Sequence, residues 1–321
     1  MNKVKIKRGL WYSQKISGTF PLAHTFKTDS NSKKAGFIWV EKDDKQIKLH
    51  VNENDFEIFD AQKAIPMEKI SENIEIRFDV METLIEGVIS RHIKSMIVSG
   101  APGIGKSYTM EKMLGEAKKA EKIDNFKVCK GMSSALGIYL KLFENCNPGD
   151  VIVLDDLDSI FGDETALNIL KGALDTTGNR TISWMAMNSY FKENDIPQEF
   201  EFNGTVVFIT NLDFDKMIEK ASKLSPHFAA LVSRCVYLDL GIHTTREILA
   251  RINQVMRKTN MLSTLGVSID KSTEIMTWLL SNCENIRSLS LRTVIQLAQF
   301  VRTSPTDWKS IAQVTLLKKF Y

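Results

Sequence analysis

Residues 96–114, MIVSGAPGIGKSYTMEKML, pass from a short apolar run through a glycine-rich turn into a segment with helical spacing. Residues 100–107 match G-x-x-x-x-G-K-[ST] without a gap, in the strand, loop and helix order that this motif requires. Glycines let successive backbone N–H groups point toward phosphate oxygens, and the positive end of the following helix adds to the attraction. The stretch therefore predicts a site for a nucleoside triphosphate.

Each polar residue of this Walker A motif has an expected role. Lys106 would reach the β and γ phosphates of ATP, and Ser107 would ligate Mg²⁺. The remaining residues expected around the nucleotide are the loop and the first helical turn: Gly100, Ala101, Pro102, Gly103, Ile104, Gly105 and Tyr108.

A second apolar run, residues 151–154, ends in two carboxylates and has the form of a Walker B strand. We expect Asp155 to hold Mg²⁺ at the strand tip and Asp156 to orient the attacking water. Asp158 is expected to be a solvated residue that begins a helix. Walker A and Walker B together make ATP hydrolysis the leading hypothesis.

Composition places few further limits on function. The 321 residues suffice for about two domains, and the formal net charge of +3 is too small to imply nucleic acid by itself. The four cysteines form no Cys-x-x-Cys pair, which predicts neither a zinc site nor a disulfide framework. No apolar run approaches the length of a membrane span, so we expect no membrane partner and a cytoplasmic location.

The first 34 residues carry a net charge of +7, with Trp11, Tyr12, Phe20 and Phe26 interleaved among the lysines. Such interleaving occurs on surfaces that bind single strands by stacking, but it is equally typical of a first strand with a solvated arm. Residues 37–40 and 46–51 predict a hairpin. Residues 1–64 are therefore expected to be a small β-rich accessory region.

From about residue 65 onward the sequence resembles the AAA+ ATPases. Its overall character is similar to that of members encoded by tailed phages, and a protein of this kind would act in the host cytoplasm. Residues 204–211 resemble the family's next core strand, ending in a polar sensor at Asn211. Residues 227–240 are similar to the stretch that carries an arginine finger, here Arg234. Residues 286–300 resemble the lid helix with a second sensor arginine, either Arg292 or Arg287.

This resemblance implies an α/β fold with a P-loop AAA+ core, in which helices flank a parallel sheet, followed by a C-terminal helical lid. The implied domains are 1–64 (β-rich accessory region), 65–240 (nucleotide-binding domain) and 241–321 (lid). Hydrolysis would occur between subunits of a ring or open-ring homo-oligomer. Asn211 is alternatively a cap of the next helix.

Two departures from the family pattern affect the expected activity. Asp156 stands where the family has Glu, which predicts slower hydrolysis or a differently held water. Residues 179–202 form an extra segment with strand-like ends, which predicts an inserted hairpin. Trp184 and Tyr190 there would either touch a substrate or pack against the sheet, and Arg180 is expected to be a hairpin charge.

The sequence leaves three uses of ATP open. Residues 241–321 have a net charge of +6, which together with the basic N-terminal region favours a motor or loader acting on DNA or a DNA-bound protein. A protein remodeller whose N-terminal region recruits a client is the second use. A nucleotide-gated scaffold that hydrolyses slowly is the third.

Overall fold

The computed structural model describes residues 3–12, 14–29, 32–42, 45–52, 54–59, 66–175, 179–186, 189–220 and 222–318. It divides the chain into two compact units, Met1–Pro66 and Met67–Tyr321. The expected boundary between residues 64 and 65 lies outside the described residues. Within the described residues, no helix is long and apolar enough to cross a membrane.

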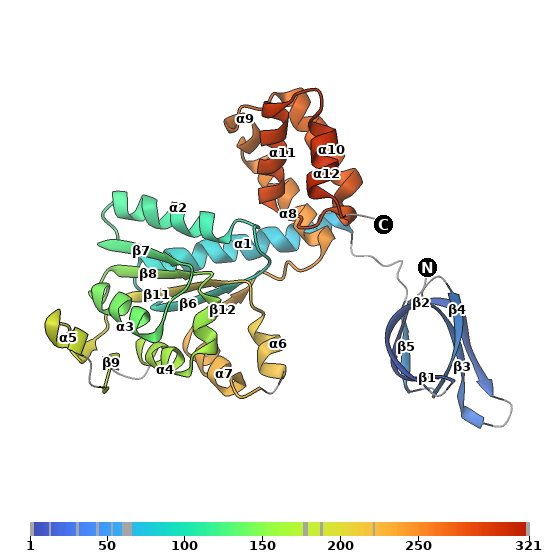
Figure 1. Cartoon of the computed structure of the whole chain (residues 1–321), viewed down its shortest axis with the longest axis horizontal. Coiled ribbons are helices and arrows are strands. Elements are labelled where there is room, and N and C mark those ends of the chain that lie inside the picture. Colours follow the sequence, from blue (N-terminus) through green and yellow to red (C-terminus); the bar gives the residue numbers. More distant parts are fainter. Residues whose placement is uncertain are drawn as a thin grey trace. The chain divides into compact units, whose positions relative to one another are not determined.

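The first unit is a small antiparallel barrel (Figure 1). Strand β1 pairs with β2 and β5, β2 with β3, β3 with β4, and the pair Leu10–His50 joins β4 back to β1. Its strands are β1 (Lys3–Trp11), β2 (Gln14–Asp29), β3 (Ser32–Lys42), β4 (Lys45–Asn52) and β5 (Phe56–Phe59). Side chains alternate between the two faces of a strand, so every second residue fills the interior, as Ile38, Val40 and Leu49 do.

The second unit is built on a parallel sheet in the order β12-β6-β11-β8-β7. The strands are β6 (Ser95–Ser99), β7 (Asn125–Lys130), β8 (Asp150–Asp155), β11 (Thr205–Thr210) and β12 (Val236–Asp239). The carboxyl ends of β6, β8 and β11 meet at one edge of the sheet, because neighbouring strands run in the same direction.

Both faces of this sheet are covered, and the strands show why. Val98, Val153 and Val207 pack toward one set of helices, whereas Ile97, Ile152 and Val206 pack toward the other. Helices α1 (Met67–Ile89) and α2 (Lys106–Lys119) cover the first face (Figure 1). The opposite face carries α3 (Ala135–Glu144), α4 (Glu164–Ala173), α6 (Phe214–Glu219) and α7 (Ser225–Arg234). The expected α/β class is confirmed.

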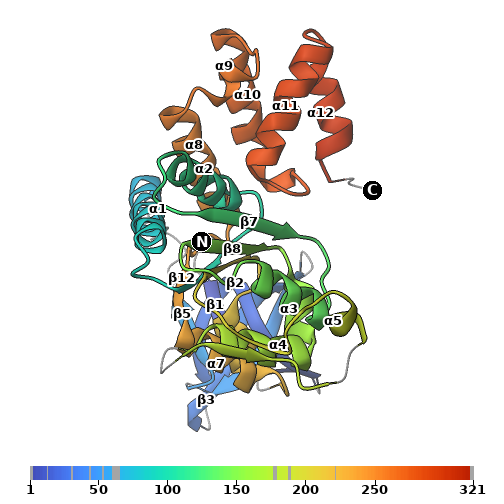
Figure 2. The same ribbon diagram turned by 90° about the vertical axis from the view of Figure 1, so that its left-hand side faces the viewer.

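The C-terminal helices form a bundle with a core of its own (Figure 2). They are α8 (Thr245–Lys258), α9 (Met261–Thr264), α10 (Ile269–Asn282), α11 (Leu291–Thr303) and α12 (Trp308–Leu316). Helix α1 ties this lid to the sheet, since Gln254 on α8 donates a hydrogen bond to Ser71 Oγ over 3.0 Å and Lys258 pairs with Glu75 at 2.5 Å.

The extra segment before β11 contains a two-stranded hairpin, β9 (Thr181–Ser183) with β10 (Glu199–Glu201), and helix α5 (Ser189–Glu193) between them. Trp184 packs against Tyr139 and Phe191, with ring centroids 5.8 and 5.9 Å apart, which favours the packing alternative for this residue. Tyr190 is 45% exposed, and its contact with a substrate stays a prediction.

Arg180 is not the hairpin charge expected from sequence. It is 6% exposed, and its guanidinium donates to the carbonyls of Ala173 at 3.2 Å and Gly204 at 2.8 Å. It therefore joins the end of α4 to the start of β11. Burial lowers the pKa of the group, so its charge costs free energy that these hydrogen bonds offset.

Replacing Arg180 with Ala should therefore destabilise the second unit. Two buried carbonyls would lose their donors, and we expect the free energy of unfolding to fall by about 1–3 kcal/mol in urea titrations. Lys192→Ala removes a cation from the exposed side of α5 and should change it by less than about 0.5 kcal/mol. Equal effects of the two substitutions would contradict a structural role for Arg180.

Candidate active site

The glycine-rich loop connects β6 directly to α2. Gly103 and Gly105 have φ angles of 69° and 103°, a region that side chains other than glycine rarely adopt. A Cβ on Gly103 would also lie 2.8 Å from Ser290 Cβ in the lid. Ile104, 1% exposed, fixes the middle of the loop in the core beside α1 and α2, whereas Tyr108 is 73% exposed.

Lys106, the first residue of α2, points back into the loop. Its ammonium donates to the carbonyls of Gly100 at 2.6 Å and Ala101 at 2.9 Å, and to Asn211 Oδ1 at 2.9 Å. Burial lowers the pKa of Lys106 to about 8, although the carboxylates of Asp156 and Asp155 oppose this shift. A cation held in this way by dipoles is suited to exchange them for phosphate oxygens.

Ser107 and Asp155 bring two oxygens together across the loop and β8. Ser107 Oγ donates to Asp155 Oδ1 at 2.9 Å, and Asp155 is 3% exposed. Hydroxyl and carboxylate oxygens are the ligands that Mg²⁺ prefers, so this pair fits the metal of a nucleotide complex. Among the described residues, no group of three or more His, Cys, Asp or Glu could hold a metal by itself.

Lys130 is a residue that sequence reasoning missed. It ends β7, the strand beside β8, and its ammonium lies 3.3 Å from Asp155 Oδ2 and 2.6 Å from Glu111 Oε1. The glutamate hydrogen bond raises the pKa of Lys130, with a smaller contribution from Asp155. Lys130 and Asp155 are partners in the parallel register of β7 and β8. In the sequence, the only signal for this contact is a lysine at the end of a strand.

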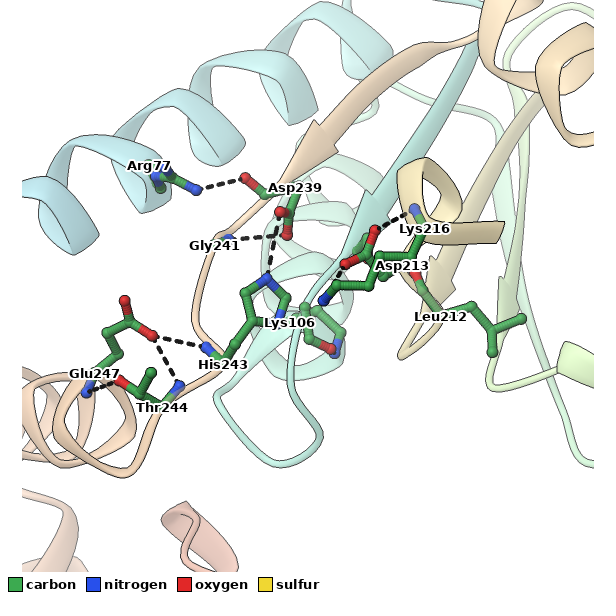
Figure 3. Close-up of polar contacts among 12 residues, drawn as sticks. Arg77, Lys106, Leu212, Asp213, Lys216, Asp239, Gly241, His243, Thr244 and Glu247 are labelled. Atoms are coloured by element: carbon green, nitrogen blue, oxygen red, sulfur yellow. Dashed lines mark hydrogen bonds and ion pairs between the residues drawn. The ribbon is translucent and has the colours of Figure 1, made fainter. Parts of the chain in front are cut away.

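Asn211 and Asp156 complete the polar cluster at the ends of β11 and β8. Asn211 Nδ2 donates to Asp156 Oδ1 at 2.8 Å, so Asn211 bridges Asp156 and Lys106. Asp156 has a φ of 54°, which is uncommon for a non-glycine residue. Asn211 does not cap the next helix: Asp213 caps α6 by accepting from the Lys216 amide at 3.0 Å, and Figure 3 shows it paired with the Lys216 ammonium.

Asp158 was expected to be a solvated residue that begins a helix, and the structure shows it half-buried at a helix start. It begins a short 3₁₀ helix, but Thr210 Oγ1 donates to its carboxylate at 2.6 Å, and Thr210 is 1% exposed. Burial raises the pKa of Asp158, while the hydrogen bond from Thr210 opposes the shift. The pair connects the tips of β8 and β11 behind Asp156.

The lid reaches the loop at the start of α11. The amide of Leu291 donates to the carbonyl of Gly103 at 2.9 Å, and Arg292 follows on the exposed side, close enough to affect the pKa of Lys106. Arg287 instead donates to the Thr315 carbonyl within the lid at 3.4 Å. Of the two candidate sensor arginines, Arg292 is thus the one beside the nucleotide loop.

Arg251 on α8 is a second lid cation that sequence reasoning missed. Its Nε donates to the Ile104 carbonyl at 3.3 Å, and its guanidinium carbon lies 3.2 Å from the ring centre of Phe78 on α1. Burial lowers the pKa of Arg251 to about 10. Arg251 therefore joins the loop, α1 and the lid. In the sequence, the spacing of apolar residues on α8 is the one signal that could have predicted this position.

Polar contacts also fix the connection between β12 and α8 (Figure 3). Arg77 on α1 donates to the Asp239 carbonyl at 3.1 Å, and Gly241, with a φ of 58°, leaves room for its guanidinium. Glu247 accepts from the amides of His243 and Thr244, while Thr244 caps α8. The lid thus joins the sheet through a short, well-bonded turn.

Arg234 does not lie with this cluster. It ends α7 just before β12, and its backbone carbonyl accepts from Ser95 Oγ at 2.8 Å, at the start of β6. Its guanidinium donates to the Ala230 carbonyl at 3.1 Å. The length of β6 separates it from the loop, about 16 Å for five residues. It therefore lies at the opposite edge of the sheet from its own nucleotide loop.

The parallel sheet, the phosphate-binding loop and the carboxylates beside it define a P-loop nucleotide-binding protein. Residues 96–225 match the model of the ATPase family associated with various cellular activities, AAA. The chain is also 38% identical over 319 residues, 97% of each chain, to the "Uncharacterized 36.7 kDa protein in nrdC-mobD intergenic region" of Enterobacteria phage T4. The chain belongs to the AAA family, as expected, and has a phage relative.

Two solved structures from Thermotoga maritima are similar to this chain. A point mutant of RuvB is 15% identical, with 76% of this chain and 69% of that chain covered at a TM-score of 0.43. Domain III of the replication initiation protein DnaA is 12% identical, with 75% and 92% covered at a TM-score of 0.44.

The lowered pKa of Lys106 gives a pH-dependent stability. Between about pH 8 and 10.5 the unfolded chain binds more protons than the folded one at this residue, so the free energy of unfolding rises with pH. The nucleotide-free wild type should gain up to about 3 kcal/mol relative to Lys106→Met over this window, measured by urea unfolding. A difference that does not change with pH would contradict a buried, charged Lys106.

The position of Arg292 predicts different effects for the two arginines. Arg292→Ala should weaken ATP binding about tenfold or more, because a cation beside the loop is lost. Arg287→Ala is the matched control and should change affinity by less than about twofold. Titration calorimetry with ATP and Mg²⁺ measures both, and a larger loss for Arg287→Ala would reverse the assignment.

Proposed function

We propose that this protein binds ATP with Mg²⁺ and hydrolyses it between the subunits of a ring or open-ring homo-oligomer. Lys106 would bind the β and γ phosphates, and Ser107 and Asp155 would hold Mg²⁺. The geometry that carries the proposal lies at one edge of the sheet, where Ser107 hydrogen-bonds Asp155 and the neighbouring Lys106 points into the loop and hydrogen-bonds Asn211. The chemistry that the bound Mg²⁺ supplies is neutralisation of phosphate charge.

Asp156 and Asn211 are proposed to hold the attacking water. Their mutual hydrogen bond of 2.8 Å gives one acceptor and one amide at the same point beside Lys106. When Lys106 moves to phosphate, Asn211 Oδ1 becomes able to accept from water. The shorter side chain of Asp156, compared with the Glu of most family members, would set a modest rate.

Arg234 is proposed to act on the nucleotide of a neighbouring subunit. The length of β6, about 16 Å, separates Arg234 from its own loop, so it does not serve a γ-phosphate bound there. An arginine supplied in trans would stabilise the charge that develops during phosphoryl transfer. Turnover would then require assembly.

The use of this hydrolysis is proposed to be remodelling or loading of an assembly associated with nucleic acid. The positive charge of residues 241–321 supports this use, as does that of the N-terminal unit. In this proposal residues 65–240 bind nucleotide, residues 241–321 report its state, and residues 1–64 recruit the target.

A slowly hydrolysing nucleotide-gated scaffold is the second candidate. The observation that favours it is the closed chain of hydrogen bonds from Lys106 through Asn211 to Asp156, which ATP must open. ATP binding without measurable turnover, in the assembled state and with single-stranded DNA present, would select this candidate.

Replacing Arg234 with Ala should abolish turnover but not ATP binding. We expect the steady-state rate to fall at least about 100-fold, because the charge on the transferred phosphoryl group loses its partner. Mixing Arg234→Ala with Lys106→Ala should restore part of the rate, since a mixed interface can combine one intact site with one intact arginine. Light scattering would establish that each variant still assembles.

Arg302→Ala is the matched control, since Arg302 is exposed on α11. This variant should keep the wild-type rate within about twofold. An inactive mixture of assembled variants, or an active Arg234→Ala protein, would contradict the role in trans.

A further inference from the structure

The outer face of the N-terminal barrel carries two aromatic rings, Phe37 and Trp39, that are not part of its hydrophobic core. The interior is filled by aliphatic residues of the strands, among them Ile38, Val40 and Leu49 at 0% exposure. Trp11, Phe20 and Phe26, which were expected to interleave with charge, pack against this core instead. Phe37 and Trp39 alternate with the interior residues of β3 and are half-buried on the outside.

These two rings lie at the centre of two rows that cross β2, β3 and β4. Each row has an aromatic ring in the middle, with one histidine and one lysine on its two sides. The register gives the rows as His24–Trp39–Lys48 and Lys27–Phe37–His50. We call these six residues the outer platform.

Ring contacts hold the outer platform together. Phe37 lies 6.4 Å from Trp39 and 4.6 Å from His50, while His24 lies edge-on to Trp39 at 6.0 Å, all between ring centres. The ammonium of Lys48 lies 3.7 Å from the centre of Phe37 and 5.3 Å from that of Trp39. The surface is therefore both aromatic and cationic.

The six residues of the outer platform carry charge of one sign. Neither row contains a carboxylate, and Glu41, the next outward residue on β3, opposes Gln46 instead of a platform residue. A half-buried aromatic pair on the outer face, among lysines, fits a ligand that has flat π faces and negative charge at regular spacing. A nucleic-acid single strand has both, whereas a duplex hides its base faces and an acidic peptide has none.

A basic hollow adjoins the outer platform and shares His50 with it. It has a volume of about 620 Å³, and its cations are Lys7, Arg8 and Lys15. Asp55 also lines it and accepts from Asn52 at 2.8 Å, and Lys7 pairs with Glu57 at 2.5 Å. The hollow lies where β1 and β4 are joined by the single residue pair Leu10–His50.

We propose that the outer platform binds single-stranded nucleic acid, with bases stacked on Trp39 and Phe37 and phosphates on Lys48, Lys27 and the cations of the adjoining hollow. This inference deepens the proposed function by assigning the surface that recognises nucleic acid. It rests on that function only for the link to hydrolysis, because the binding itself needs no ATP.

The test is binding of labelled oligothymidylate of about 20 nucleotides to the full-length chain without nucleotide, by fluorescence anisotropy at low salt. Trp39→Leu and Lys48→Ala should each weaken binding about tenfold or more. Tyr12→Ala and Lys5→Ala are matched controls for the ring and the charge, since both residues are exposed and lie outside the platform. They should change the affinity by less than about twofold.

The Trp39→Phe variant distinguishes a loss of base stacking from a loss of folding as the cause of weaker binding. A Phe ring still stacks, so this variant should bind nearly as well as wild type, whereas the quenching of tryptophan fluorescence by the oligonucleotide should disappear. The other four tryptophans, Trp11, Trp184, Trp278 and Trp308, lie outside the outer platform. Oligouridylate of equal length distinguishes RNA from DNA, and binding of either supports the proposal.

Three results would overturn the proposal: no binding at low salt, equal affinity for a duplex, or Trp39→Leu that melts like wild type and binds equally well. ATP turnover by the same preparations tests the proposed function separately. Normal ATP turnover without oligonucleotide binding would contradict nucleic-acid binding by the outer platform and leave the proposed hydrolysis standing. Oligonucleotide binding without ATP turnover would contradict the proposed hydrolysis and leave the binding standing.

Discussion

A buried ammonium group organises the nucleotide-binding site of the second unit. Lys106 begins a helix at the end of a fully buried strand, where a cation is costly unless dipoles and negative charge surround it. Its partners come from the loop backbone and from Asn211, and the carboxylates of β8 lie close behind. The order β6-β11-β8 is what makes this possible, because it places β11, which leads to Asn211, between β6, which leads into the loop of Lys106, and β8, which ends at Asp155.

The same constraint extends to the lid. The loop around Lys106 is tight enough that Gly103 contacts Ser290 and Leu291, and Arg251 holds the carbonyl of Ile104 from α8. We expect a change in the loop on binding phosphate to reach α8 through the Arg251 side chain and α11 through the Leu291 amide. Helix α1 is bonded to α8, which links the lid to the face of the sheet that α1 covers.

Features encoded in contiguous residues could be predicted from the sequence, whereas those that depend on register could not. The loop, its flanking strand and helix, and the carboxylates after β8 are local patterns, and the fold class was implied by the resemblance to the AAA+ ATPases that they support. Lys130 beside Asp155 and Thr210 beside Asp158 arise from the alignment of separate strands. Arg180, Arg251 and the choice of Arg292 over Arg287 depend on which helix packs where. Phe37 and Trp39 could be placed outside the barrel only once its interior was known.

A structure determined with a non-hydrolysable ATP analogue and Mg²⁺ would test the role of Lys106 without relying on turnover. We predict that the ammonium of Lys106 leaves the carbonyls of Gly100 and Ala101 for the β and γ phosphates. Ser107 and Asp155 should then hold one metal ion between them, with Asn211 and Asp156 facing the γ-phosphate. A Lys106 that keeps its three present partners while the nucleotide binds elsewhere would contradict this role.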